Sequence, residues 1–365
     1  MKVAMLGQKG IPASFGGIER HVEELSTRLV NMGHEVTVFC RPYYTSLNGS
    51  FKGVRLRKLP SLQTKHFDTI THTLLASVAS SLGGYDIVHY HGIGPSSLSW
   101  IPKITGRRVV ATIHAMDWRQ QKWGGFAKRC LKFGEQSAVM WPDRTIAVSR
   151  QLVREIQSRH ADSSPVYMPN GANLGEWREP REMLKLGIER ERYILTVGTL
   201  IPDRGVQYLI EAFNQLDTEM RLVIVGGPHH TEEYADALKR MVDRRTVFTG
   251  WVYGPLLREL YGNCYVYVHP SEVEGLPISL LEAMAHGRCV LTSDIPENLE
   301  AQSGCGVSFR SRDSGDLRDK LAMLLENPGR VTEMGGQACA HIAHHHNWDR
   351  IARLTERVYL DALKR

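Results

Sequence analysis

The 365-residue chain lacks any apolar run of the roughly 20 residues that a helix needs to span a bilayer. Its first residues, MKVAMLG, form an apolar run too short for a signal peptide, so we expect a buried first strand and a cytoplasmic protein. Cysteine is sparse, and its six copies include no C-x-x-C pair. Most of them lie in apolar segments, which predicts reduced core residues rather than disulfides. No Asp-x-Asp sequence occurs, so the chain has no metal-binding loop of that kind.

Hydrophobic residues make up 42% of the chain and charged residues 23%, which is a globular composition long enough for two domains. The charge is uneven, because residues 1–180 hold 23 Lys and Arg against 13 Asp and Glu, and the remainder holds 22 against 26. The basic half indicates an anionic surface or ligand, such as membrane phosphates or a pyrophosphate-linked compound. Nucleic acid would also fit, but no nucleic-acid-binding module is recognisable.

Apolar strands alternate with amphipathic helices in both halves of the chain. The strand candidates are KVAMLG, EVTVFC, DIVHYHG, RVVATIH, RTIAVS and VYMPNG, followed by RYILTVG, RLVIVGG, TVFTGW, CYVYVHP and CVLTSD. The pattern predicts an α/β protein of two doubly wound, Rossmann-like domains, residues 1–175 and 176–348, joined where GANLGEWREPR breaks both periods. Residues 349–365 are expected to form one amphipathic helix. Ligand should bind at the carboxyl ends of the strands, in a cleft that the domains face.

The segment 269–287, HPSEVEGLPISLLEAMAHG, places two carboxylates eight residues apart across the start of a short helix. Glu274 lies in the loop that follows an apolar strand. Glu282 lies in the helix, expected at about 278–286, for which Pro277 suits the first position because its missing N–H has no partner there.

The backbone N–H groups of Gly275 and Leu276 then lie at the positive end of the helix dipole, where an anion is favoured. An anion site beside two carboxylates that accept hydrogen bonds from hydroxyls fits a nucleotide sugar. The helix end would hold the diphosphate, one carboxylate the ribose, and the other would face the sugar. The alternative is a surface helix with ordinary acidic residues.

The stretch EGLPISLLEAMAHG resembles the E-x(7)-E signature of the retaining family 4 glycosyltransferases, which have the GT-B fold. The resemblance implies that Glu274 lies by the donor sugar, that Glu282 binds the ribose, and that transfer retains the anomeric configuration. PHHTEEY at 228–234 and LTSDIPENLE at 291–300 resemble a bacterial subset that builds surface polysaccharides. That likeness implies a saccharide or lipid-linked acceptor at the inner membrane face.

The loop GQKGIPASFGGIERHVEEL follows the first strand and opens a helix. Gly16 and Gly17 can bring bare N–H groups against a phosphate there, although a purely structural loop is the alternative. The loop is similar to the family 4 loop that approaches the donor diphosphate and the acceptor.

His114 ends the strand RVVATIH, at an edge where ligands are expected. A structural histidine is the alternative, but TIHAMDW resembles the family segment whose histidine contacts the donor sugar. Asp117, Ser149 and Arg150 occupy similar edges and fit capping or surface roles equally well.

The segment LTVGTLIPDRGVQYLIEAF resembles a family stretch reading G-R-x(4)-K-G, whose Arg and Lys neutralise the diphosphate. In this chain those positions are Thr199 and Arg204. Arg204 can replace the lysine as a charge, whereas Thr199 offers only a hydroxyl. Leaving-group stabilisation is then weaker or comes from another basic residue such as Lys9.

No metal or other cofactor is expected. The start of the 269–287 helix, the Gly16 and Gly17 amides and Arg204 would stabilise the departing diphosphate without one. The run HIAHHH at 341–346 lacks both the zinc spacing and a carboxylate partner, which predicts a solvated patch.

The segment 118–133, WRQQKWGGFAKRCLKF, interleaves aromatic and basic residues. It predicts a helix that lies either on the inner membrane surface or on its own domain.

Two other functions remain open at this stage. A non-hydrolysing sugar-nucleotide epimerase would turn over the donor with no acceptor. A nucleotide-sugar-binding protein of little activity is the second, because Thr199 replaces one expected cation. The expected partners are a nucleotide sugar and a saccharide or lipid-linked acceptor, without nucleic acid.

Overall fold

The computed structural model describes the whole chain except residues 65–66, 122, 176–178, 230 and 365. The chain forms two compact units, of which the first comprises Met1–Asn170 with Trp348–Arg365 and the second comprises Gly171–Asn347. The sequence had placed these divisions after residues 175 and 348. Residues 176–178 of the predicted linker, 122 of the 118–133 segment and 230 of PHHTEEY lie outside the described residues.

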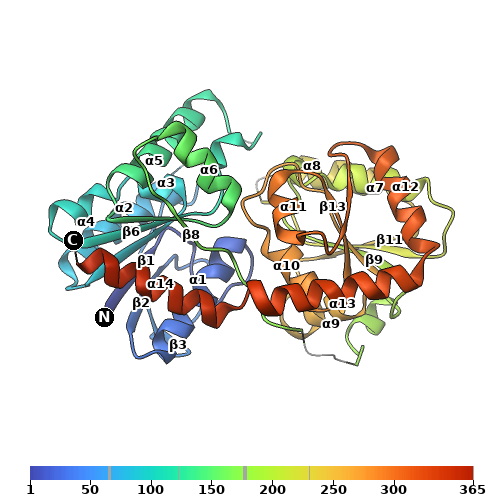
Figure 1. Ribbon diagram of the computed structural model, residues 1–365, viewed down its shortest axis with the longest axis horizontal. Helices are drawn as coiled ribbons and strands as arrows, with labels where there is room; N and C mark the ends of the chain where they lie inside the picture. The colour runs from blue at the N-terminus through green and yellow to red at the C-terminus, as the bar shows by residue number, and fades with distance from the viewer. Residues whose placement is uncertain (65–66, 122, 176–178, 230, 365) are drawn as a thin grey trace. The chain divides into compact units, whose positions relative to one another are not determined.

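The first unit is built on an eight-stranded sheet in the order β3-β4-β2-β1-β5-β6-β7-β8 (Figure 1). β3 pairs antiparallel with β4, and the other neighbours pair in parallel. The strands are β1 (Lys2–Leu6), β2 (Glu35–Cys40), β3 (Ser50–Phe51), β4 (Val54–Lys58), β5 (Ile87–His91), β6 (Arg108–Ile113), β7 (Arg144–Ala147) and β8 (Val166–Tyr167). In register, Val3 lies opposite Val36 on one side and Ile87 on the other.

Helices cover both faces of this sheet. They are α1 (Gly17–Asn31), α2 (Asp68–Leu82), α3 (Ile93–Ser96), α4 (Trp100–Ile104), α5 (Gly125–Met140), α6 (Arg150–Arg159) and α14 (Trp348–Leu363). The C-terminal helix α14 packs on α1 and β6, so it completes the core of the first unit. Arg28 of α1 pairs with Asp349 of α14 at 2.7 Å.

The segment 118–133 does not form one helix, so that expectation is wrong. A single 3-10 turn, η1 (Asp117–Arg119), is followed by an extended Gly124, and α5 begins only at Gly125. Two consecutive glycines favour this break because glycine is a poor helix former. Trp118 packs on its own unit, where its Nε1 donates to Glu135 at 2.8 Å and the Arg159 guanidinium lies 4.5 Å from its ring centroid. Phe126 and Phe133, however, are exposed on α5.

The second unit has a six-stranded parallel sheet in the order β11-β10-β9-β12-β13-β14 (Figure 1). Its strands are β9 (Tyr193–Val197), β10 (Arg221–Val225), β11 (Thr246–Gly250), β12 (Val266–His269), β13 (Cys289–Ser293) and β14 (Val307–Phe309). Its α-helices are α7 (Val206–Asn214), α8 (Glu232–Met241), α9 (Gly254–Asn263), α10 (Ile278–Ala285), α11 (Pro296–Gln302), α12 (Ser314–Leu325) and α13 (Pro328–His345). Two 3-10 turns complete it, η2 (Met183–Leu186) and η3 (Pro202–Arg204).

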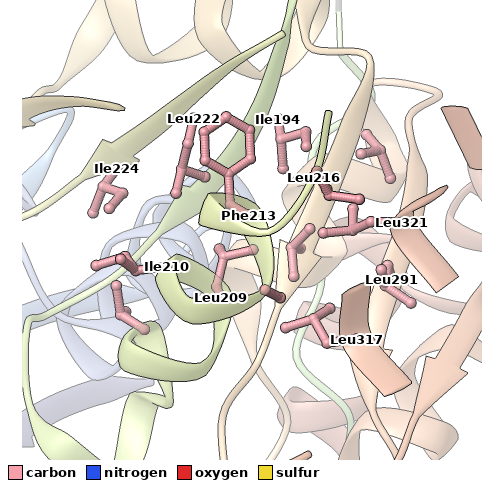
Figure 2. Packing of buried hydrophobic residues seen from close by; sticks show 14 of the residues in the cluster. Ile194, Leu209, Ile210, Phe213, Leu216, Leu222, Ile224, Leu291, Leu317 and Leu321 are labelled. Atoms are coloured by element: carbon pink, nitrogen blue, oxygen red, sulfur yellow. The ribbon is translucent and has the colours of Figure 1, made fainter. Parts of the chain in front are cut away.

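The core of the second unit lies between the sheet and helices α7 and α12. Phe213, at the end of α7, packs among Ile194 of β9 and Leu222 of β10, and Leu317 and Leu321 enter from α12 (Figure 2). These side chains are fully buried, and each contributes about 1.5–3 kcal/mol by leaving water. This packing fixes the carboxyl ends of β9, β10 and β12, where the pocket of this unit opens.

The cysteines are free thiols, but they do not all lie in the core. Cys40, Cys264 and Cys289 are buried, whereas Cys130 is exposed. The expectation of core residues is wrong for Cys130, because it lies on the solvent face of α5.

None of the described helices is long and apolar enough to cross a membrane.

Candidate active site

An open pocket lies at the carboxyl ends of β9, β10 and β12 in the second unit. Thr199, Arg204, His269 and Ser271 are among its lining residues. Arg204 is the charged residue of this lining. The carboxyl edge of an open parallel sheet is where α/β proteins bind their ligands, so the pocket has the position expected of a ligand site.

Gly205 brings the loop that carries Arg204 close to the loop after β12. Its φ of 65° is left-handed, and a side chain there would collide with the carbonyl oxygen of Pro270. Glycine therefore satisfies both the conformation and the close approach. Gly205 ends the 3-10 turn η3 and directly precedes α7. Arg204, the last residue of η3, therefore lies beside the pocket.

Five side chains form one connected group beside this pocket. The Glu274 carboxylate forms an ion pair with Arg204, and His269 Nε2 lies 2.9 Å from the same carboxylate oxygen. The Arg204 guanidinium also donates to the Ser271 hydroxyl at 3.4 Å. On the other side of the imidazole, His269 Nδ1 lies 3.3 Å from the Tyr267 hydroxyl. Arg204 and Glu274, which sequence analysis had selected separately, thus contact each other.

His269 is neutral in this group. Burial lowers its pKa to about 3, with a further lowering from the nearby Arg204 cation. A neutral imidazole has one N–H, so His269 can donate from Nε2 to Glu274 while Nδ1 accepts from Tyr267. Burial also raises the pKa of Tyr267, which keeps its hydroxyl protonated. The group therefore holds one cation and one carboxylate, both ordered by neutral neighbours.

Glu282 borders the same group from α10. It is half-buried, and its carboxylate is close enough to Tyr267 to contribute to the raised pKa of that phenol. Glu274 and Glu282 therefore both lie near the Tyr267–His269 pair.

Pro277 is the N-cap of α10 rather than its first residue, which corrects one prediction. Its ψ of 113° is extended, the helix begins at Ile278, and Leu281 N donates to the Pro277 carbonyl. The first-turn N–H groups without an intrahelical acceptor therefore belong to residues 278–280 rather than to Gly275 and Leu276. Gly275 and Leu276 are buried in the loop that leads into this turn.

Thr199 lines the pocket and is partly exposed. Its hydroxyl adds no charge. The positive charge of the lining is that of Arg204 alone, and Glu274 already neutralises it.

His114 lies in the first unit, within a buried cluster that sequence analysis did not detect. His21 of α1, His91 of β5 and His114 after β6 bring one ring nitrogen each to within 4.8 Å of one another. His91 Nδ1 lies 3.2 Å from His114 Nε2, and His21 Nδ1 lies 2.8 Å from Asn170 Oδ1. Burial lowers the pKa of His21 to about 4, and burial and the neighbouring rings lower the pKa of His114 well below its usual value.

This trio is the candidate metal-ligand set of the described residues, and the histidine run at 341–346 is not. Three imidazoles suit zinc. A metal bound to both His91 Nδ1 and His114 Nε2 would, however, have to replace the hydrogen bond that joins them. The pattern HYH in β5 is the sequence signal for this cluster, since His89 and His91 alternate along one strand and point to the same face.

Gly16 and Gly17 play different structural roles. Gly16 has a φ of 101°, and a side chain there would collide with Glu19, whereas a side chain at Gly17 would meet open space. Carboxylates of α1 hold the loop, because Glu19 accepts from Lys9 N at 2.8 Å and Glu23 accepts from the backbone of residue 13 at 2.6 Å. The ammonium group of Lys9 lies over the Phe15 ring, within the first unit.

The three weaker candidates have local contacts. Ser149 caps α6, because its hydroxyl accepts from Leu152 N at 3.1 Å. The Arg150 guanidinium lies 4.6 Å from the Tyr167 ring centroid. Asp117 begins η1 and accepts from Gln120. For Ser149 the capping alternative is confirmed.

Comparison with known proteins identifies the family. Residues 15–176 match the family described as Glycosyltransferase Family 4, and residues 191–327 match Glycosyl transferases group 1. D-inositol 3-phosphate glycosyltransferase of Gordonia bronchialis is 29% identical, over 92% of this chain and 81% of the relative.

Two solved structures share the fold across nearly their whole length. Sucrose-phosphate synthase from Thermosynechococcus elongatus has a TM-score of 0.83 at 20% identity, covering 100% of this chain and 99% of that one. Anabaena HepE in complex with UDP-glucose has a TM-score of 0.79 at 16% identity, covering 98% and 99%. With two parallel-sheet Rossmann-like units and both family matches, the chain belongs to the GT-B glycosyltransferases of the family 4 and group 1 type.

Proposed function

We propose that the chain transfers a glycosyl group from a nucleoside-diphosphate sugar to a saccharide or lipid-linked saccharide, with retention of configuration and without a metal. The observation that supports this proposal most directly is the group formed by Arg204, Glu274 and His269 beside the pocket of the second unit. A cation and a carboxylate held together at the carboxyl edge of a parallel sheet suit a diphosphate and sugar hydroxyls. The fold shared with HepE, whose structure holds UDP-glucose, supports the same class of donor.

Each residue of the proposed site has its own role in binding the donor or in stabilising the leaving group. Arg204 and the first-turn amides of α10 neutralise charge on the departing diphosphate. Glu282 accepts from ribose hydroxyls and Glu274 faces the donor sugar, while His269 holds Glu274 in place. His114 takes the sugar-contacting role that its likeness to the family segment implies, and Gly16 and Gly17 that of the diphosphate loop.

In the proposed step, the bond between the anomeric carbon and the diphosphate oxygen breaks. An acceptor hydroxyl attacks from the face that the diphosphate leaves, through an oxocarbenium-like state. Its proton passes to a phosphate oxygen of the leaving group, so that the products are the glycoside and the nucleoside diphosphate. Charge stabilisation by fixed dipoles and one guanidinium is the reason to propose a metal-independent reaction.

The acceptor proposal rests on charge and on a relative. The excess of Lys and Arg in residues 1–180 suits an anionic acceptor. The Gordonia relative is named for a phosphorylated acceptor, D-inositol 3-phosphate.

The test is turnover of a panel of nucleoside-diphosphate sugars, with and without saccharides and lipid extract, followed by mass spectrometry and NMR. A transferase gives a new glycoside only when donor and acceptor are both present, and retention gives product with the anomeric configuration of the donor. Epimerised donor without acceptor would indicate an epimerase instead. Binding without turnover under all conditions would indicate a nucleotide-sugar-binding protein. That alternative arises because Thr199 replaces one expected cation.

A further inference from the structure

Helix α2 of the first unit exposes its apolar face and buries its polar face. Its large apolar side chains, Leu74, Leu75, Val78 and Leu82, are exposed, and Leu82 is 81% exposed. The buried face carries small or polar residues, which are His72, Thr73, Ala76, Ser77, Ser80 and Ser81. A surface helix of a globular protein normally buries its apolar stripe and exposes its polar face.

The buried hydroxyls of α2 have hydrogen-bond partners within the first unit. The hydroxyls of Thr73, Ser77 and Ser81 each donate to a carbonyl one turn earlier in α2, at 2.7 to 2.8 Å. Ser77 also shares a 2.7 Å hydrogen bond with the hydroxyl of Tyr90 on β5. Small side chains let α2 lie close to the sheet, so the exposed leucines are not required by the core of this unit.

Helix α4 extends the apolar surface. It packs on α2 (Figure 1), and it exposes Trp100 and Ile104, the latter by 71%. Arg107, just after α4, donates to the carbonyls of Ser81 in α2 and of Tyr85 shortly after α2, at 3.1 and 3.4 Å. We call the surface formed by Leu74, Leu75, Val78, Leu82, Trp100 and Ile104 the α2–α4 patch. Apolar residues gathered in this way on a surface mark an interaction site.

The sequence around the α2–α4 patch has more basic than acidic residues. Between residues 69 and 108 the sequence has one acidic residue, Asp86, against the basic residues Lys103, Arg107 and Arg108. Lys103 and Arg108 share the carboxylate of Asp143. Among the described residues no carboxylate pairs with Arg107, which donates to backbone carbonyls instead. The apolar surface therefore has a cationic margin.

We propose that the α2–α4 patch docks on a lipid bilayer that contains anionic headgroups. Exposed leucines, a tryptophan and flanking cations are the composition of a helix surface that lies in the membrane interface. A second copy of this chain fits less well, because a two-fold contact would bring each Arg107 toward its own equivalent surface. The docking does not depend on the donor site, although a lipid-linked acceptor would use it.

The membrane contact then lies at the α2–α4 patch and not at residues 118–133. Phe126 on α5 is as exposed as Leu82, at 81%, so exposure alone does not separate the two surfaces. The two surfaces differ in the contacts beneath them. Helix α2 buries a polar face, whereas in the α5 region Trp118 packs inward and donates a hydrogen bond to Glu135.

The experiment is flotation of the full chain with vesicles of phosphatidylcholine alone or mixed with phosphatidylglycerol. Wild-type protein should float with the mixed vesicles and lose binding as salt rises. The double variant Leu82→Glu/Ile104→Glu should bind at least about tenfold less, because each carboxylate opposes both burial and the anionic surface. The matched control, Phe126→Glu/Phe133→Glu, should bind as wild type.

Three results would overturn the proposal: no flotation of wild-type protein, loss of binding only in the α5 control, or a wild-type dimer that the Leu82 and Ile104 substitutions dissociate. Melting temperature checks that the variants fold, and Leu82→Ser/Ile104→Ser replaces the glutamate pair if that pair unfolds. A nucleotide-induced shift in melting temperature reports the donor site separately, so loss of lipid binding and failure of the proposed function are distinguishable.

Discussion

Replacing Arg204 with methionine should weaken binding of the nucleoside diphosphate by about 10- to 100-fold. Arg204 provides the positive charge of the pocket lining, and methionine keeps much of its length without charge or donors. A hydrogen bond to a charged group contributes about 1.5–3 kcal/mol. Since about 1.4 kcal/mol corresponds to a factor of ten in affinity, the loss falls in the stated range.

The same substitution should lower the free energy of unfolding, because it leaves Glu274 without its cation. The Glu274 side chain is 7% exposed and that of Arg204 is 31% exposed. Breaking a fully buried pair costs about 3–5 kcal/mol, and the exposure of Arg204 reduces this to about 1–3 kcal/mol. The pKa of His269 should rise, because Arg204 is one of the two causes that lower it.

Calorimetric titration with nucleoside diphosphates measures the affinity, and chemical unfolding measures the stability. The double variant Arg204→Met/Glu274→Gln separates the two effects, since a neutral amide no longer needs a cation. It should regain most of the stability but none of the affinity. Unchanged affinity in the single variant, or recovered affinity in the double variant, would refute the assignment of Arg204 to the diphosphate.

The remaining predictions concern the same site and the buried histidines. Thr199→Arg should tighten binding of the nucleoside diphosphate by about tenfold in calorimetry, because it restores the second cation, and a weaker complex would contradict this. Glu282→Ala should raise the dissociation constant for the nucleotide, whereas Glu274→Gln should lower kcat more than affinity; steady-state kinetics that match wild type in both would remove the two carboxylates from the site. A chelator should leave the transfer rate nearly intact, and complete loss that magnesium restores would show that the reaction needs a metal. Stability should fall as pH drops from about 6.5 toward 4, because His89 and His269 have pKa values of about 3 in the folded protein and take up protons first in the unfolded chain. Each contributes a loss of about 2 kcal/mol at pH 5, measurable by denaturant titration, and constant stability over this range would contradict buried neutral rings.

The two Rossmann-like units were predictable because their strands are buried on both faces and therefore read as continuous apolar runs. The second unit confirms all its predicted strands, from RYILTVG at β9 to CVLTSD at β13. β14 and the β3–β4 pair were missed for a physical reason. β14 is three residues long, and β4, next to the edge strand β3, alternates buried Val54 and Leu56 with charged residues.

The contacts of the site were less predictable than its residues. Spacing identified Glu274 and the resemblance identified Arg204, but their ion pair depends on a left-handed turn at Gly205 that no periodicity reveals. His269 was passed over because it ends an apolar strand, where a histidine reads as core. The histidine cluster of the first unit required contacts between α1, β5 and the end of β6, which local sequence cannot specify.

The 118–133 segment failed as one helix because its basic and aromatic composition masked the break at Gly124 and Gly125. Conversely, α2 drew no attention in the sequence, since its leucines and serines look like an ordinary amphipathic helix. Only burial revealed which face is turned outward.

The most direct test of the central claim is a thermal-shift screen of the purified protein against UDP, GDP, ADP and their common sugar conjugates. A ligand that binds only the folded state raises the melting temperature. The account predicts a clear rise with the nucleotides of one base, and its loss in the Arg204→Met variant. No rise with any of them, or a rise that Arg204→Met leaves unchanged, would contradict a nucleotide-sugar site built on Arg204 and Glu274.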